Sequence, residues 1–374
     1  MGTSELASKF GYTVAEHVVT TEDGYLLVLH KLEKKKKVVS VDKRIVYFHH
    51  GLMTCSELWL CGSYKNKNLP FLLADLGHEV WLGNNRGNKY SRKHLKLSSS
   101  LKEFWDFSLD EFAMYDICDT LKYIYGFYGC TKRITYVGFS QGCSQLFACL
   151  SLKPYLNEYL DLFVALSPAI VPRELHHPLF KVMVKLAAQD ESFLYTLLGK
   201  RALFLSVSFW CHFLGSKWYE TIVDICLKYL FGWSGTNISK DQKVLGYPYM
   251  FLNSSVKCLV HWFQIIHSKR FQMYNETCSI GRTTLSNYYE NRSHSAVPFP
   301  ISFHLNVPML VFYGDADLLV DIKSFKSLVL GLNPQMREKL IDIIRCPTYE
   351  HMDTIWGDKV YEDVFEKIIQ VLET

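Results

Sequence analysis

The chain has 374 residues, 49% of them hydrophobic, which is enough to bury an extensive core in one large domain or in a core with an insertion. Lys and Arg number 41 against 37 Asp and Glu, and the net charge of +4 is too small for the electrostatic footprint of a nucleic-acid-binding protein. The 11 cysteines form no C-x-x-C pair, which indicates reduced, packed thiols rather than a disulfide framework or a zinc site, so we expect no metal and no cofactor.

Short, nearly continuous apolar runs recur along the chain and predict buried strands. Such runs, apolar on both faces, are typical of parallel strands that helices cover on both sides. Between two of them, the apolar residues from Leu109 to Ile124 fall on one face of a predicted helix. Alternating strands and helices predict an α/β fold with a mostly parallel central sheet. The predicted strands are Ile45–Phe48, Val80–Leu82, Ile134–Val137, Leu162–Leu166, Met309–Tyr313 and Ile341–Ile344.

The alternation stops near Pro168 and resumes near Pro308. We therefore predict a core formed by residues 1–168 and 301–374, and an inserted, mainly helical segment of residues 169–300. Ligands of open α/β sheets bind at the carboxyl edge of the strands, so an insertion over that edge would act as a lid or a substrate wall. Its helix-like, aromatic stretches are Phe193–Leu198, Ala202–Leu214, Tyr219–Phe231 and Val256–Ile266.

The pentapeptide GFSQG at residues 138–142 lies between a predicted strand and a predicted helix that starts at Gln141. In such a G-x-S-x-G turn the glycines let the backbones approach and the strained turn exposes the serine hydroxyl, here that of Ser140. The amide of Gln141, at the helix N-terminus, would point toward an oxyanion. The pentapeptide by itself is also compatible with a structural turn that carries an idle serine.

A serine nucleophile needs a base and a group that orients the base. The stretch YGDADLLVD follows a predicted strand and offers carboxylates at Asp315, Asp317 and Asp321. Further along, YEHMDTIW follows the last predicted strand and puts His351 in a loop before the final helix. Nucleophile, acid and base therefore occur in the chain order that α/β-hydrolases use.

A second oxyanion donor is expected from the loop after an early strand. The stretch HHGL at residues 49–52 follows the first of the predicted strands and would supply the amide of Leu52. His50 could be mistaken for the base or for a metal ligand. No carboxylate or cysteine stands near it at ligand spacing, so we do not assign it either role.

The chain resembles the acid-lipase group of α/β-hydrolases, which includes gastric and lysosomal acid lipases and fungal steryl ester hydrolases. The resemblance runs nearly from end to end. The forms NNRGNKYS, GFSQG and VHWFQ are closer to the fungal steryl ester hydrolases than to the animal digestive enzymes. The stretches that carry it are TEDGYL, HHGL, NLPF, VWLGNNRGNKYS, FWDFS, GFSQG, SVKCLVHWFQ and FQM.

The resemblance implies an α/β-hydrolase fold with helices on both faces of the sheet and a cap or lid over residues 169–300. It implies Ser140 as nucleophile, Asp317 as the orienting acid and His351 as base, with the amides of Leu52 and Gln141 as the oxyanion hole. The family has glycine where this chain has Asp315. Asp317 therefore occupies the position that matches the family's acid.

We expect hydrolysis of carboxylic esters of bulky lipids, foremost steryl esters, at a membrane or lipid-droplet surface. A triacylglycerol lipase would need the same three residues, and a non-catalytic lipid-binding scaffold would not need to keep them. Several aromatic residues of the inserted segment would line an acyl or sterol pocket or touch a lipid surface, although ordinary packing explains any one of them equally well. These residues are Phe209, Trp210, Phe213, Trp218 and Trp233.

The N-terminus lacks the basic stretch followed by an apolar one that marks a signal peptide. No apolar run reaches the about 20 residues that span a bilayer. Members of the resembling group carry a signal peptide or a membrane anchor, whereas this chain begins almost at the catalytic region. We therefore expect an intracellular protein peripheral to membranes or lipid droplets, or a secreted or lysosomal one if an N-terminal signal has been removed. The sequence does not predict the oligomeric state.

Overall fold

A computed structural model describes residues 1–34, 43–189, 192–202, 215–276, 296–331 and 334–374. In these ranges nine strands form one sheet with the order β1-β2-β4-β3-β6-β7-β8-β9, and the short β5 pairs with β2. The strands are β1 (Tyr12–Thr20), β2 (Tyr25–Lys34), β3 (Ile45–His49), β4 (Glu79–Leu82), β5 (Lys93–His94), β6 (Ile134–Phe139), β7 (Leu160–Leu166), β8 (Met309–Gly314) and β9 (Leu340–Cys346).

The strands from β4 to β9 across the sheet are parallel, whereas β1 and β2 form an antiparallel edge. The six strands predicted from apolar runs correspond to β3, β4, β6, β7, β8 and β9, which confirms the predicted α/β sheet. The edge strand β1 was not predicted. Its residues are mostly exposed or half-buried, so its sequence lacks the continuous apolar run of a central strand.

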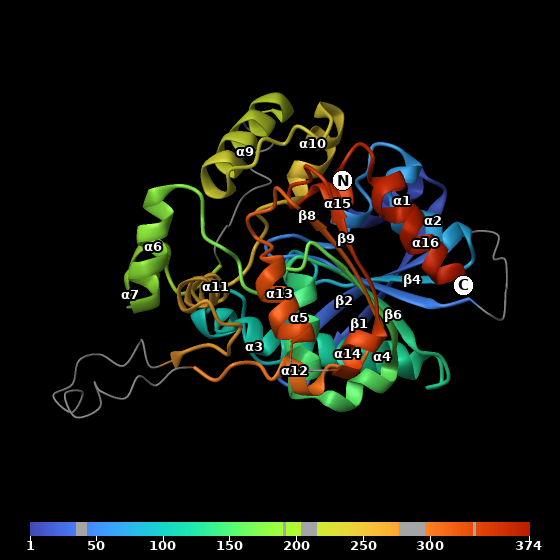
Figure 1. Ribbon diagram of the computed structural model, residues 1–374, viewed down its shortest axis with the longest axis horizontal. Coiled ribbons are helices and arrows are strands. Elements are labelled where there is room, and N and C mark those ends of the chain that lie inside the picture. Colours follow the sequence, from blue (N-terminus) through green and yellow to red (C-terminus); the bar gives the residue numbers. More distant parts are fainter. Residues whose placement is uncertain (35–42, 190–191, 203–214, 277–295, 332–333) are drawn as a thin grey trace.

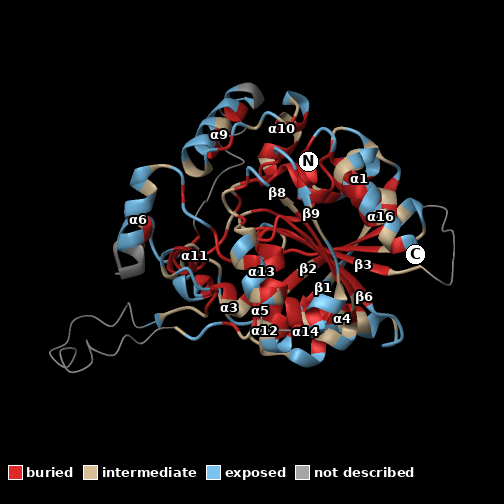
Figure 2. Cartoon of the chain, viewed as in Figure 1, coloured by how far each residue is buried: buried red, intermediate tan, exposed pale blue. Residues whose placement is uncertain are grey.

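Residues of the central strands alternate between two cores, one on each face of the sheet. In β3, Ile45 and Tyr47 belong to one buried cluster, and Val46 and Phe48 belong to the other. The same alternation recurs in β6, β7 and β8. Because successive side chains of a strand point to opposite faces, a run that is apolar at every position is buried on both sides. Figure 2 shows these strands buried at the centre of the molecule.

Helices cover both faces of the sheet (Figure 1). In the described ranges no helix is long and apolar enough to cross a membrane. The helices of the predicted core are α1 (Thr3–Lys9), α2 (Leu69–Asp75), α3 (Leu109–Glu111), α4 (Cys118–Phe127), α5 (Gln141–Leu152), α12 (Ile301–His304), α13 (Ile322–Leu330), α14 (Pro334–Lys339), α15 (Asp353–Trp356) and α16 (Glu366–Glu373).

The helix predicted over Leu109–Ile124 is present, with a π-helical turn at Phe112–Ile117 between α3 and α4. The turn contains Asp116, which is buried and accepts hydrogen bonds from the backbone amide of Arg86 at 3.0 Å and from its Nε at 2.7 Å. The carboxylate thus compensates a buried guanidinium, which would be costly to bury alone.

The inserted segment, residues 169–300, leaves the sheet after β7 and returns at β8. Predicted helix-like stretches correspond to α7, α9 and α11, whereas residues 203–214, including Phe209, Trp210 and Phe213, lie outside the described ranges. Figure 1 shows these helices gathered on one side of the sheet. They are α6 (Pro178–Gln189), α7 (Ser192–Leu198), α9 (Ser216–Phe231), α10 (Lys240–Gly246) and α11 (Val256–Ser268).

Candidate active site

Ser140 stands at the sharp turn between β6 and α5. Its backbone has φ 54° and ψ −119°, a region that residues other than glycine rarely adopt. The turn is held from both sides, since the Ser140 amide donates to the Leu166 carbonyl at 3.0 Å and the Ser140 carbonyl accepts from the Cys143 amide at 3.0 Å. Strain maintained in this way is the signature of a strand-to-helix turn that presents a nucleophile.

Glycines allow the elements around Ser140 to pack closely. A Cβ atom on Gly142 would lie 2.5 Å from the carbonyl oxygen of His49 and 2.7 Å from that of His50. A Cβ atom on Gly51 would lie 3.1 Å from the Cβ of Ser140. The second glycine of GFSQG therefore lets α5 approach the HHGL stretch, which brings that loop against the serine.

His351 and Asp317 form a buried pair. The imidazole Nδ1 lies 2.6 Å from Asp317 Oδ2, and Asp317 Oδ1 accepts from the Leu319 amide at 2.8 Å. Because a carboxylate only accepts, Nδ1 of His351 carries the proton and the neutral ring has its lone pair at Nε2. That Nε2 is buried and makes no hydrogen bond within the described ranges. His351 is thus arranged to take a proton.

The other two aspartates of YGDADLLVD have different contacts. Asp315 binds Arg345 at 2.6 Å and accepts from the Thr348 amide at 2.7 Å, and the hydrogen bond from Arg345 lowers the pKa of Asp315. Asp321 caps α13, where it accepts from the Lys323 amide at 3.2 Å. Of the three carboxylates that the sequence left open, Asp317 is therefore the one in contact with His351.

Ser167, at the carboxyl end of β7, supports the loop of His351 and was not singled out from the sequence. Its hydroxyl donates to the His351 carbonyl at 3.0 Å and lies 2.9 Å from Thr354 Oγ1. Its φ of 44° is again unusual for a residue with a side chain. A polar residue directly after a central strand was the available signal, since functional groups gather at that edge of the sheet.

The two predicted oxyanion donors are brought together with Ser140. Gln141 opens α5, so its amide is among the first four of the helix, which have no partner within the helix. Leu52 lines the same cavity as Ser140 and Gln141. The Gln141 side chain points elsewhere, because its Oε1 accepts from Trp262 Nε1 of α11 at 2.7 Å. This hydrogen bond joins the turn at Ser140 to the inserted segment.

His50 is a structural support for the HHGL loop. Its Nε2 accepts from the Asn85 amide at 3.1 Å, so the ring proton is on Nδ1, which donates to the Gly51 carbonyl at 2.8 Å. Complete burial lowers the pKa of His50 to about 3. The neutral ring thus holds the carbonyl that precedes Leu52.

A dependence of stability on pH follows from the buried His50. In the unfolded chain this histidine takes up a proton below about pH 6.5, whereas the folded protein resists the proton down to about pH 3. The unfolded state therefore binds more protons between these pH values. Through His50, acidification lowers the free energy of unfolding of the wild type by up to about 1.4 kcal/mol per pH unit, and a His50→Gln variant lacks this loss.

Urea unfolding between pH 7 and 4.5 measures this effect. The stability difference between wild type and His50→Gln should shrink as the pH falls, while the same change at the exposed His267 serves as control. A difference for His50→Gln that does not change with pH would contradict a neutral, buried His50.

Ser140, His351, Leu52 and Gln141 all line one cavity of about 390 Å³. The remaining walls are almost wholly apolar and come largely from the inserted segment, for example Phe180, Leu227, Leu259, Trp262 and Phe263. In the described ranges no group of three or more His, Cys, Asp or Glu residues could hold a metal ion.

Two of the predicted aromatic residues can be placed. Trp233 lines the cavity, and its ring stacks on that of His351 with centroids 5.4 Å apart and planes 15° apart. Trp218 is 71% exposed and does not line the cavity, so the structure does not bring it to the other predicted site residues.

Comparisons with known proteins show the family of the chain. Residues 44–342 match the family model described as "alpha/beta hydrolase fold", and residues 3–63 match the one described as "Partial alpha/beta-hydrolase lipase region". A Schizosaccharomyces pombe protein named "Probable lipase C1672.09" is 40% identical over 98% of this chain and 76% of its own length. Human lipase member K is 31% identical over 100% of this chain and 91% of its own length. The chain belongs to the acid-lipase family of α/β-hydrolases.

The family makes the protein a carboxylic ester hydrolase of the lipase and esterase type. Rat gastric triacylglycerol lipase is also 31% identical, over 100% of this chain and 91% of its own length. Among solved structures, a monoglyceride lipase of Saccharomyces cerevisiae superposes with a TM-score of 0.53 over 96% of this chain and 97% of that one, at 14% identity. At that identity the superposition supports the fold alone.

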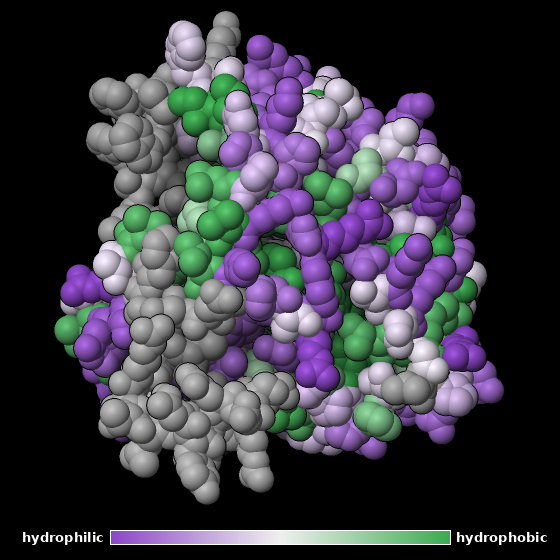
Figure 3. Space-filling model, turned by 60° about the vertical axis from the view of Figure 1, so that its left-hand side comes forward, coloured by the Kyte–Doolittle hydropathy of each residue, from purple (hydrophilic) through white to green (hydrophobic). Residues whose placement is uncertain are grey.

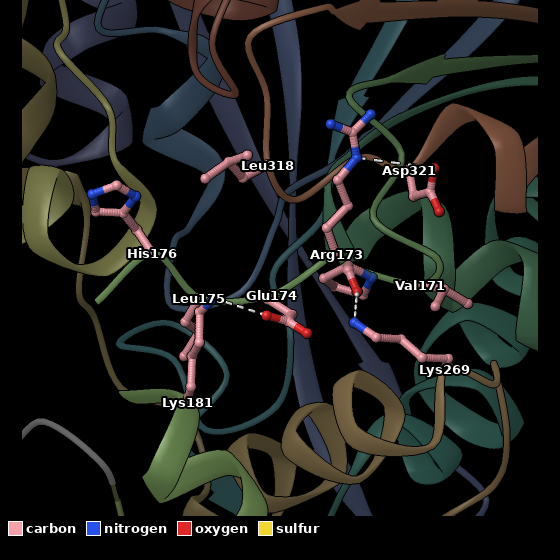
Figure 4. Close-up of a pocket in the computed structure, with 10 residues that line it drawn as sticks. Val171, Arg173, Glu174, Leu175, His176, Lys181, Lys269, Leu318 and Asp321 are labelled. Carbon is pink, nitrogen blue, oxygen red and sulfur yellow. Dashed lines mark hydrogen bonds and ion pairs between the residues drawn. The ribbon is translucent and has the colours of Figure 1, made fainter. Parts of the chain in front are cut away.

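A second pocket of the hydrolase, of about 410 Å³, lies beside the cavity and shares Pro172 and Leu175 with it. Its charged side chains largely face one another (Figure 4). Arg173 approaches Asp321 to 3.9 Å, and Lys181 binds Glu174 at 2.9 Å. Neither Ser140 nor His351 lines this pocket. We therefore take the apolar cavity as the candidate substrate site.

Proposed function

We propose that the protein hydrolyses carboxylic esters of bulky lipids, foremost steryl esters, with Ser140 as nucleophile, His351 as base and Asp317 as the orienting acid. The observation that carries the proposal is the contact of 2.6 Å between Asp317 and His351, whose imidazole lines a largely apolar cavity together with Ser140. An aqueous cleft would suit small soluble esters, whereas apolar walls suit long chains and rings.

The reaction proceeds through an acyl-enzyme. Nε2 of His351 takes the proton of Ser140 as the hydroxyl oxygen attacks the ester carbonyl, and Asp317 stabilises the imidazolium that forms. The tetrahedral intermediate collapses as His351 returns the proton to the departing alcohol. A water molecule, deprotonated by His351, then attacks the acyl group, and the fatty acid leaves as Ser140 recovers its proton.

The amides of Leu52 and Gln141 stabilise the negative oxygen of each tetrahedral intermediate. Loss of one such donor typically costs about 3 to 4 kcal/mol of transition-state stabilisation. The Gly51 carbonyl held by His50, together with the close contact between Gly51 and Ser140, supports a fixed orientation of the Leu52 amide.

Exposed apolar stripes on two helices support action at a lipid surface. On α9, Trp218, Ile222, Ile225 and Tyr229 are 71%, 41%, 49% and 55% exposed and follow one another at helical spacing on one face. An exposed apolar stripe of this kind marks an interaction site, and Trp and Tyr favour the boundary between membrane and water.

A similar stripe of Leu179, Val182 and Leu186 lies on α6. Figure 3 shows hydrophobic residues on this side of the molecule, set among hydrophilic ones. Both helices also contribute to the cavity wall, α6 through Phe180 and α9 through Leu227. We propose that the inserted segment is a cap through which a lipid ester passes from the surface to Ser140.

A panel of esters tests the proposed substrate class. Long-chain steryl esters and triacylglycerols, dispersed in the same detergent micelles, are compared with short soluble esters on wild type and on Ser140→Ala. We expect the lipids to be cleaved with the higher kcat/KM, steryl esters foremost, and Ser140→Ala to remove all of these activities. Triacylglycerols cleaved far better than steryl esters would favour the triacylglycerol alternative. A strong preference for short soluble esters would contradict the lipase assignment.

A further inference from the structure

The loop that carries His351 is fastened to the inserted segment by the neighbouring Glu350. Its Oε1 accepts from the Ser234 amide at 2.6 Å and from the Ser234 hydroxyl at 2.9 Å, and its Oε2 accepts from the Gly235 amide at 2.8 Å. Glu350 is only 8% exposed. Hydrogen bonds to a buried carboxylate are stronger than those between neutral groups, so this is a strong local attachment.

A second attachment, through Asn237, lies beside the first. Nδ2 of Asn237 donates to the Thr348 carbonyl and to Asp353 Oδ2, both at 2.8 Å. The same Oδ2 atom of Asp353 accepts from the Glu350 amide at 2.7 Å. The backbone of the histidine loop and the inserted segment are thus held by one connected set of hydrogen bonds.

The attachment fixes the residue directly before Ser234, which is Trp233. Gly232, in the left-handed conformation with φ 71° and ψ 14°, ends α9 and turns the chain so that Trp233 follows. Trp233 is 6% exposed and its ring lies nearly parallel to that of His351, with planes 15° apart. In the described part of the chain, Phe139 from β6 of the core is the other ring against the imidazole, with centroids 5.0 Å apart.

We propose that Glu350 is a positioning residue that acts through Trp233: by holding Ser234 and Gly235, it keeps the indole against the His351 imidazole. This inference rests on the proposed role of His351 as base. Trp233, a ring beside the base, then belongs to the inserted segment, and the orientation of the base depends on whether that segment is seated on its loop.

Two other roles for Glu350 make different predictions. A purely structural attachment would change stability, and its loss would lower activity only by unfolding the protein. A direct charge effect on the imidazolium would persist without the indole. Positioning through Trp233 requires instead that the Glu350 and Trp233 effects on kcat overlap, because both remove the same contact.

A double-mutant cycle on a short soluble ester separates these roles. Glu350→Gln keeps the shape but puts an amide NH₂ where one acceptor oxygen meets backbone donors. We expect Glu350→Gln and Trp233→Leu each to lower kcat by about tenfold to 10²-fold with KM changed less than about threefold, as for a misplaced catalytic group. The kcat of the double variant should be little lower than that of the less active single variant.

Controls keep the cycle interpretable. Glu366→Gln makes the same chemical change at an exposed position of α16 and should leave kcat unchanged. Ser234→Ala removes the 2.9 Å hydroxyl bond to Glu350 and a 3.2 Å contact with Thr236 Oγ1, but it keeps both backbone bonds to Glu350. It should show a smaller loss of kcat that also disappears in the Trp233→Leu background. A thermal unfolding curve of each variant shows whether the protein is folded at the assay temperature.

Each outcome decides the matter. Losses that multiply in the double variant, or an unchanged kcat in folded Glu350→Gln, would overturn the inference while the proposed function stands. If Trp233→Leu does not fold, Trp233→Phe replaces it in the cycle with Glu350→Gln. We then expect a lowered kcat in each single variant, because neither the Trp233 indole nor the Glu350 carboxylate is sufficient alone. Ester hydrolysis by His351→Ala at the rate of the wild type would contradict the proposed function itself, and this inference with it.

Discussion

Asp317→Asn is expected to lower kcat for ester hydrolysis by about 10⁴ with little change in fold. The carboxylate holds the proton of His351 on Nδ1 through the 2.6 Å bond and leaves Nε2 free to act as base. An asparagine amide can present its NH₂ group to Nδ1, which favours the opposite tautomer and puts the proton on the nitrogen that must accept one. Steady-state kinetics on a soluble ester measures the loss.

Asp315→Asn is the matched control, two residues away. Asp315 binds Arg345 and the Thr348 amide at the surface, and it has no contact with His351. We expect its kcat to stay within about threefold of wild type, in line with the small contribution of exposed ion pairs. Equal losses in the two variants, or a larger loss at Asp315, would show that the acid has been assigned to the wrong residue.

Ser140→Ala is expected to remove the nucleophile and to lower kcat by about 10⁶, to the level that binding and the oxyanion hole supply alone. The wild type should also form a covalent adduct with a fluorophosphonate probe, and Ser140→Ala should not. Mass spectrometry of the labelled peptide locates the adduct. Alanine fits the volume of serine, so circular dichroism should show an unchanged fold.

The labelling experiment also addresses the scaffold alternative. Folded wild type that neither reacts with the probe nor hydrolyses any ester would indicate a non-catalytic α/β-hydrolase that binds lipid. Labelling that persists in Ser140→Ala would indicate another nucleophile and would contradict the role proposed for Ser140.

Several elements of the fold were predictable from short stretches of sequence. The run from Ile45 to Phe48 is apolar at each position because its side chains enter both cores, and side chains of β6, β7 and β8 also enter both. The turn at Ser140 was predictable because glycine, serine and the helix start are neighbours in the chain. The antiparallel edge strand β1 was missed because most of its residues are exposed or half-buried, so it has no continuous apolar run.

The candidate site was predictable in its members and in their chain order, and less so in its contacts. The sequence left three aspartates open until a family resemblance favoured Asp317, and the 2.6 Å contact with His351 now supports the same residue. Trp218 and Trp233 were equal candidates from composition. One proved 71% exposed and the other stacks on His351, a difference that depends on how α9 packs.

The sequence by itself determined the central strands and the turn at Ser140, because periodicity and turn chemistry depend on residues a few positions apart. The order of the proposed nucleophile, acid and base can also be read directly along the chain. The tertiary structure decided which carboxylate reaches the histidine, which ring covers it, and that Glu350 binds Ser234 across 116 residues of chain. Such contacts arise from the order of strands in the sheet and from the packing of the inserted segment, and neither is encoded in any local stretch.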